Sequence, residues 1–257
     1  MIISLEQLVV LFLIVGRIAG VFIQAPIFSS RSFPIFAKSA LAVWIALLLW
    51  FVTPINQTLP QTPGAFIFAL AIEVGIGFVI GFICNLIFLM VQAGGEIADL
   101  QMGLSVATTL DPIFGAVISI IGRLVFFLAL VIFIIADGHH LLLSALHQSF
   151  TAFPAGSMVN FSSPDLAMQM INLGTMFWAT AIKLAAPIVL LIFLADFSFG
   201  IVSRVAPQVN VFMLGFQVKP AIGLVGIMLT LPFIVKYINY LIGVMAGQFI
   251  LLAQTLK

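Results

Sequence analysis

The sequence predicts an all-α protein of long apolar helices in a membrane or a membrane complex, and its composition and hydropathy pattern carry that prediction. Of 257 residues, 63% are hydrophobic and only 7% are charged, whereas soluble domains carry about 25% charged residues. A helix of about 20 apolar residues crosses a bilayer, and backbone groups in hydrocarbon must be satisfied within the segment. A net charge of +1 gives no reason to expect a nucleic acid as partner. Six apolar stretches are found, over residues 7–30, 35–56, 64–92, 113–136, 166–202 and 220–254.

Capping residues, prolines and glycines mark the expected ends of these helices. Ser4 and Gln7 have the spacing of a capping box at the start of the first stretch. Proline is preorganised for the first helical position, so helix starts are expected at Asp111-Pro112, Ser163-Pro164 and Lys219-Pro220. Further breaks are expected at Pro34, at residues 54–63 and at Gly94-Gly95.

The last two stretches are too long to be simple spans. Residues 166–202 would measure about 55 Å as one helix, against a hydrocarbon core of about 30 Å. We therefore expect these helices to bend, to tilt or to extend beyond the membrane.

The basic residues of the short connections predict an orientation. Connections 31–38 and 203–219 contain Lys and Arg, whereas 53–63 and 137–165 contain neither. Because cytoplasmic loops are enriched in Lys and Arg, the first two are expected inside and the others outside. Six crossings then place both termini outside.

Ionisable residues within or beside the apolar stretches need partners. A charge at a lipid-exposed helix centre costs about 2.5–3.5 kcal/mol on insertion scales. Pairing between helices or subunits is the favoured interpretation; an ion relay and snorkelling at helix ends remain open. The residues are Arg17, Glu73, Arg123, Lys183, Asp196 and Lys236.

A stripe of small and polar residues follows the third stretch at helical spacing. If the helix is continuous, these residues share one broad face, and glycine there permits close approach by another helix. We interpret this face, with Arg17 and Arg123, as a charged packing interface between subunits. The stripe consists of Glu73, Gly77, Gly81, Asn85, Gln92, Glu96, Asp99 and Gly103.

The segment after this stripe is small, weakly polar and free of Lys and Arg. Irregular backbone at membrane depth must be buried in protein or line a water cavity. The pattern alone favours an ordinary connector over a pore-occluding loop. The residues are Gly103, Leu104, Ser105, Val106, Ala107, Thr108, Thr109, Leu110, Asp111, Pro112, Ile113, Phe114 and Gly115.

No motif of an enzyme active site is found: H-E-x-x-H, the P-loop and G-x-S-x-G are all absent. The one cluster with metal-binding residue types is Asp137, His139 and His140, with His147 nearby. Adjacent helical histidines point about 100° apart, so the sequence favours a hydrated helix start and predicts no metal site and no cofactor.

The 203–219 connection is rich in turn-forming and hydrogen-bonding residues. It is either a plain link between antiparallel helices or a cytoplasmic contact loop. The contact candidates are Arg204, Pro207, Gln208, Asn210 and Lys219.

Several strings, in order along most of the chain, resemble the FliR family of flagellar export-gate subunits and its T-subunit relatives of type III secretion. They are Arg17-Ile-Ala-Gly20 with Pro26, Glu73-Val-Gly-Ile-Gly77, Ala93-Gly-Gly-Glu96-Ile-Ala-Asp99-Leu-Gln-Met-Gly103-Leu-Ser105, Asp111-Pro112, Asp137-Gly-His-His140 and Arg204-Val-Ala-Pro207-Gln208-Val-Asn210-Val-Phe212. The strings Ala93–Ser105 and Arg204–Phe212 are specific for this family when they occur together.

The resemblance implies a subunit of a closed protein-export gate, not an enzyme. Residues 1–163 would resemble a P subunit (FliP) and residues 164–257 a Q subunit (FliQ), and these proteins would be partners. FlhB-like and FlhA-like components, unfolded export substrates and membrane lipid would be the other partners, at the flagellar basal body of a bacterial inner membrane. Loop 103–115 would be the plug, and much of the gate would project toward the periplasm.

Two alternatives belong to other classes. A secondary transporter would use Glu73, Glu96, Asp99 and Arg123 as an intramembrane charge relay, although no inverted repeat of the kind such transporters contain is evident. An intramembrane enzyme would need an active-site constellation that the sequence does not show.

Overall fold

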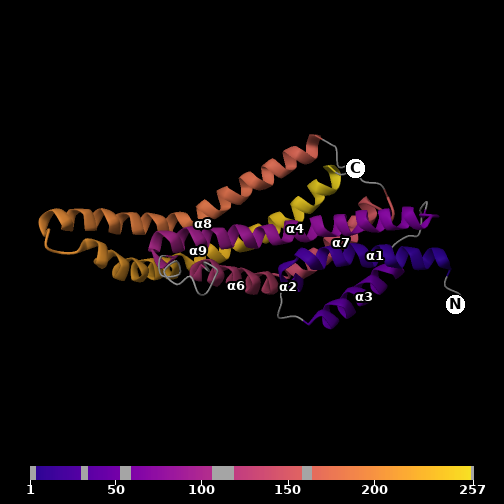
Figure 1. Ribbon diagram of the computed structural model, residues 1–257, viewed down its shortest axis with the longest axis horizontal. Helices are drawn as coiled ribbons and strands as arrows, with labels where there is room; N and C mark the ends of the chain where they lie inside the picture. Colours follow the sequence, from indigo (N-terminus) through magenta and orange to yellow (C-terminus); the bar gives the residue numbers. More distant parts are fainter. Residues whose placement is uncertain (1–3, 30–33, 53–58, 106–118, 158–163, 256–257) are drawn as a thin grey trace. The chain divides into compact units, whose positions relative to one another are not determined.

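The computed structural model describes residues 4–29, 34–52, 59–105, 119–157 and 164–255. In these ranges every regular element is a helix, which confirms the predicted all-α class (Figure 1). Among them, five helices are long and apolar enough to cross a membrane, or six if the bent pair α6 and α7 is one span. The helices are α1 (Leu5–Gln24), α2 (Pro26–Ser29), α3 (Ile35–Val52), α4 (Pro63–Met102), α6 (Ile120–Ile135), α7 (Gly138–Ala152), α8 (Pro164–Val205) and α9 (Val211–Thr255).

Several predicted helix ends are confirmed. Ser4 Oγ accepts the N–H of Gln7 at 3.2 Å and Gln7 Oε1 accepts the N–H of Ser4 at 3.0 Å, which completes the capping box. Prolines open α4 and α8. The over-long C-terminal stretches are confirmed as helices of 42 and 45 residues.

The expected break at Gly94-Gly95 is wrong, because α4 runs through both glycines. A Cβ added at Gly95 would lie 2.7 Å from Gly122 Cα of α6, and one at Gly94 would lie 2.9 Å from Leu184 Cβ of α8. Glycine weakens an isolated helix by about 1 kcal/mol, but here the missing side chains admit two neighbouring helices. Tertiary packing therefore outweighs the local propensity.

The expected helix start at Pro220 is also wrong. Asn210 Oδ1 accepts the N–H of Met213 at 3.1 Å, and its carbonyl accepts the N–H of Leu214 at 3.1 Å. This is the geometry of an N-cap, so α9 begins at Val211 and Pro220 lies inside it. Only residues 206–210 of the predicted 203–219 connection lie between α8 and α9.

The region 137–165, predicted as an external connection, contains the 15-residue helix α7. Leu142, Leu146 and Phe150 recur every four residues and are buried. This spacing is the signature of a helix with one apolar face, but the sequence is too short and too polar to stand out as a membrane span.

The described chain divides into two compact units. The first comprises residues 1–87, 137–173 and 242–257, and the second comprises 88–136 and 174–241. In the first unit the core lies between α1, α4 and α7, with Leu13, Ile14, Ile83 and Leu146 fully buried. The second unit has a core cluster of Ala98, Met102, Ile121, Ile188, Ile192 and Ile227.

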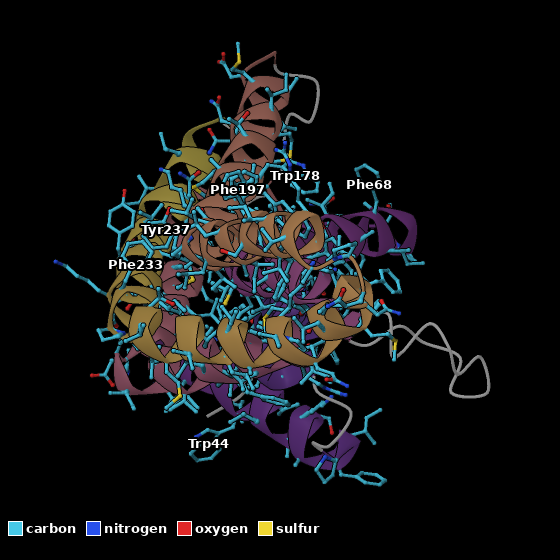
Figure 2. All side chains as sticks on the ribbon, turned by 90° about the vertical axis from the view of Figure 1, so that its left-hand side faces the viewer. Trp44, Phe68, Trp178, Phe197, Phe233 and Tyr237 are labelled. Atoms are coloured by element: carbon cyan, nitrogen blue, oxygen red, sulfur yellow. The ribbon has the colours of Figure 1, made fainter. Side chains whose placement is uncertain are left out.

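Three helices leave most of their apolar surface uncovered. Only 11% of the span window of α3 is buried, against 17% for α8 and 28% for α9. Trp44 of α3 and Trp178 and Phe197 of α8 are all more than half exposed, and the side chain of Trp44 projects away from the ribbon (Figure 2). A soluble monomer does not expose such continuous apolar faces, so lipid or other subunits must cover them.

We expect Gly95→Ala to destabilise the protein by about 1–3 kcal/mol, because it overpacks the contact of α4 with α6. The matched control is Gly174→Ala on α8, where no described atom lies within 4 Å of the added Cβ and better helix propensity should stabilise by about 1 kcal/mol. Thermal unfolding in detergent, followed by circular dichroism, measures both. Equal midpoints for the two variants would contradict the close approach.

Candidate functional site

A buried ion pair organises the first unit. Arg17 of α1 donates from Nε to Glu73 Oε2 of α4 at 2.6 Å, and both side chains are fully buried. The predicted pairing of ionisable residues inside the apolar stretches is confirmed for these two. Because an isolated buried charge is very costly, each of the two holds the other in place.

The remaining polar atoms of the pair are bonded as well. Arg17 Nη1 donates to Ser149 Oγ at 3.0 Å and Nη2 to the carbonyl of Phe153 at 2.8 Å. Glu73 Oε1 accepts the N–H of Gly156 at 2.8 Å. The guanidinium carbon lies 4.0 Å from the centre of the Phe150 ring, which adds a cation–π interaction. The network thus ties α1 and α4 to α7 and to the segment after it.

Three glycines allow α1 and α4 to approach this closely. A Cβ added at Gly20 would overlap the carbonyl oxygen of Val74, and one at Gly77 would overlap that of Arg17. Gly81 faces Val21 of α1 in the same way. The glycines of the stripe therefore admit a helix of the same chain, and their role in packing against other subunits stays a prediction.

Only some of the other polar residues of the stripe form side-chain hydrogen bonds. In the first unit, Asn85 Nδ2 donates to Gln24 Oε1 at 3.3 Å. In the second unit, Gln92 Nε2 donates to the exposed Glu96 at 2.8 Å. Asp99 is 1% exposed, and its Oδ1 has no hydrogen-bond partner among the described residues. Arg123 lies exposed on α6.

Only the start of the predicted plug can be placed. Gly103 ends α4 with a left-handed φ of 79°, and its N–H donates to the carbonyl of Leu100 at 3.1 Å. Glycine is the usual residue for such a helix end. Leu104 packs against the core of the second unit, whereas Val106–Gly115 lie outside the described residues.

The residues of the predicted contact loop lie in two places in the structure. Arg204, Pro207, Gln208 and Asn210 are exposed at and around the turn that joins α8 to α9. Lys219 instead lies on α9, where its Nζ pairs with Asp196 Oδ1 of α8 at 2.5 Å. Its assignment to a loop is wrong, because the Asn210 cap starts α9 well before it. The ion pair borders a cavity of about 370 Å³ that Gly103 also lines.

The structure brings Asp137, His139 and His140 together, contrary to the argument from helical angles. One ligand atom of each lies within 4.8 Å of the others, and the two imidazole rings have centroids 4.3 Å apart. The rings converge because their side chains rotate, whereas the 100° argument fixes only the Cα–Cβ directions.

Sequence reasoning missed Ser149, Phe150, Phe153 and Gly156 as partners of the ion pair. The buried face of α7 could have indicated the first two through its spacing with Leu142 and Leu146. No sequence signal could have identified the carbonyl of Phe153 or the N–H of Gly156, because every residue other than proline carries both groups.

Comparisons with known proteins show the family of the chain. The model of the family described as bacterial export proteins, family 1, matches residues 8–245. The chain belongs to this family. This membership confirms the resemblance seen in the motifs and assigns the chain to the protein export apparatus.

Relatives of two kinds are similar to this member of family 1. The flagellar biosynthetic protein FliR of Pectobacterium carotovorum subsp. carotovorum is 32% identical over 225 residues, 88% of this chain and 85% of that protein. FliR of Bacillus subtilis (strain 168) is 30% identical over 215 residues, 81% of each. The Yop proteins translocation protein T of Yersinia pestis is 33% identical over 150 residues, 58% of each.

We expect Arg17→Met to lower the stability of this family 1 protein by about 3–5 kcal/mol, because it leaves the Glu73 carboxylate buried without its counter-ion. The double variant Arg17→Met/Glu73→Met should recover most of that loss, since it removes both charges. Thermal unfolding in detergent of the single and double variants measures the coupling.

Lys219→Met is the matched control for this cycle. It removes a cation whose ion pair is 25% and 40% exposed, so its cost should stay below about 1 kcal/mol. If Arg17→Met proves no more harmful than Lys219→Met, the buried pair does not hold the first unit together.

Proposed function

We propose that the chain is a core subunit of a flagellar type III protein export gate in the bacterial inner membrane. The similarity to FliR over 88% of the chain carries the proposal. The apolar, uncovered faces of α3, α8 and α9 support it, because a subunit that assembles inside a membrane needs such faces.

The proposed partners are the P and Q subunits, FliP and FliQ. Residues 1–163 take the place of a P-like part, and α8 and α9 form the Q-like hairpin of residues 164–257. The exposed Trp44 and Trp178 are suited to contact other apolar helices, since aromatic side chains bury a large area at interfaces. FlhB-like and FlhA-like components would contact the turn around Pro207 and Gln208 from the cytoplasm.

The proposed mechanism is passage of an unfolded protein and includes no bond-making step. Segment 103–115 occupies the channel at rest and moves aside for a substrate. The left-handed Gly103 supports this, because it ends the rigid helix α4 where the segment begins.

The alternative of a transporter with a charge relay gains no support. Glu73 would have to exchange a proton, but its carboxylate accepts bonds from Arg17 and from the N–H of Gly156. A relay through Glu73 would have to break both of these bonds.

The test of function is a gene deletion in the source bacterium. Loss of the chain should abolish motility and secretion of flagellar subunits, and a tagged copy should restore both and co-purify with FliP and FliQ. Normal secretion in the deletion strain would refute the proposal.

We expect replacement of residues 104–114 by a glycine–serine linker of equal length to make the inner membrane permeable to ions while the complex still assembles. The reason is that the linker lacks the side chains that fill the channel. A potential-sensitive dye measures the leak, and co-purification of FliP and FliQ confirms assembly.

Glu6→Gln, at an exposed position in the first turn of α1, is the control and should keep the membrane potential intact. An intact potential in the linker variant, with assembled complex, would contradict the role of the segment as a plug.

A further inference from the structure

Three polar side chains at the start of α7 form a cluster that the export function does not use. They are Asp137, immediately before the helix, and His139 and His140 in its first turn. Their ligand atoms lie within 4.8 Å of one another. We propose that these three residues bind a divalent transition-metal ion, with Zn²⁺ as the best match.

The backbone at Asp137 is held in an unusual state. Its φ of 54° is the one positive value at a non-glycine residue in the described part of the chain. Aspartate tolerates this conformation better than most residues, but it remains uncommon. Such conformations gather at functional sites, where the surrounding structure enforces them.

The Asp137 carboxylate does not make the hydrogen bond that is usual for an aspartate at its position. An aspartate before a helix normally accepts a backbone N–H of the first turn, yet Asp137 makes no side-chain cap. Its side chain is exposed, so the carboxylate can turn toward the imidazoles. A negative group here also offsets the positive end of the helix dipole, which would otherwise oppose a bound cation.

His139 gives an independent indication. Its Nδ1 is buried and has no hydrogen-bond partner among the described residues. Buried polar atoms are nearly always satisfied, so a partner is missing. The neighbouring ring of His140, 4.3 Å away between centroids, places a second nitrogen ligand beside it.

The donor set selects the kind of ion. Two imidazoles and one carboxylate are suitable ligands for Zn²⁺. By the usual order of metal affinities they would also bind Cu²⁺ and Ni²⁺. Mg²⁺ and Ca²⁺ prefer oxygen ligands alone. With zinc bonds of about 2.0–2.2 Å, bound ligand atoms lie closer together than the 4.8 Å within which these three atoms are found. The exposed side chains of Asp137 and His140 can close that gap by rotation. Water would complete the coordination shell.

The site would fix the start of α7, the helix that supplies Ser149 to Arg17. A bound ion stabilises the folded protein in proportion to its occupancy. Added Zn²⁺ should therefore raise the unfolding midpoint, and Mg²⁺ should not.

The test uses the full chain, purified in detergent with a tag that contains no histidine. Calorimetric titration should show one Zn²⁺ per chain, and Co²⁺ should give visible absorption bands typical of nitrogen and oxygen ligands. His139→Ala and His140→Ala should each weaken Zn²⁺ binding roughly tenfold or more. Loss of a residue that only hydrogen-bonds to a metal ligand already weakens binding by about that much, and loss of a ligand should cost at least as much.

Two further variants make the test specific. Asp137→Asn removes the charge but keeps a residue that adopts positive φ readily, so it should weaken binding without unfolding α7. His147→Ala, on the same helix but outside the cluster, should bind Zn²⁺ like the original chain. No binding by the folded chain, or equal binding by the double variant His139→Ala/His140→Ala, would overturn the proposal.

Discussion

A guanidinium and a carboxylate that are both removed from water can persist only if each has bonding partners, and this requirement shapes the first unit. Arg17 and Glu73 satisfy each other, and Ser149, Phe153 and Gly156 take up most of their remaining bonding capacity. The contact needs α1 and α4 nearly backbone to backbone, which explains the glycines at their interface. Desolvation of the pair offsets much of its attraction. Its contribution is therefore to specify which helices meet, because any other arrangement would leave a buried charge alone.

The distribution of polarity is the reverse of that in a soluble protein. The bonded ions are buried, whereas Trp178 and Phe197 are largely exposed and Trp44 points away from the ribbon (Figure 2). A surface of this kind has no stable state in water, since each exposed side chain of this size loses about 1.5–3 kcal/mol of transfer free energy there. In lipid the hydrophobic drive between helices disappears, and close packing and polar bonds decide the fold. The glycine contacts and the Arg17 network are interactions of those two kinds.

Local features of the sequence could be predicted, and pairings between distant residues could not. The capping box of Ser4 and Gln7 is confirmed because both residues lie within one helical turn. The need of Arg17 for partners was predictable from its apolar surroundings. Its actual partners were not, since Ser149 and Phe153 lie 132 and 136 residues away. Pro220 was a misleading start signal, because the Asn210 cap had already begun α9. The convergence of His139 and His140 depends on side-chain rotation, which no residue spacing encodes.

The stripe on α4 shows how packing inside a chain limits packing between chains. A glycine face can receive one neighbouring backbone, and at Gly77 the backbone of Arg17 already fills that place. At Gly95, which lies on α4 but outside the stripe, the backbone of Gly122 does the same in the second unit. At both positions the nearest backbone therefore belongs to the same chain. The surfaces that remain for assembly are the uncovered apolar faces of α3, α8 and α9. Contacts there would involve large side chains such as Trp44 and Phe197. Such an interface can form after each chain has folded around its own ion pair, so folding and assembly need not compete for the same residues.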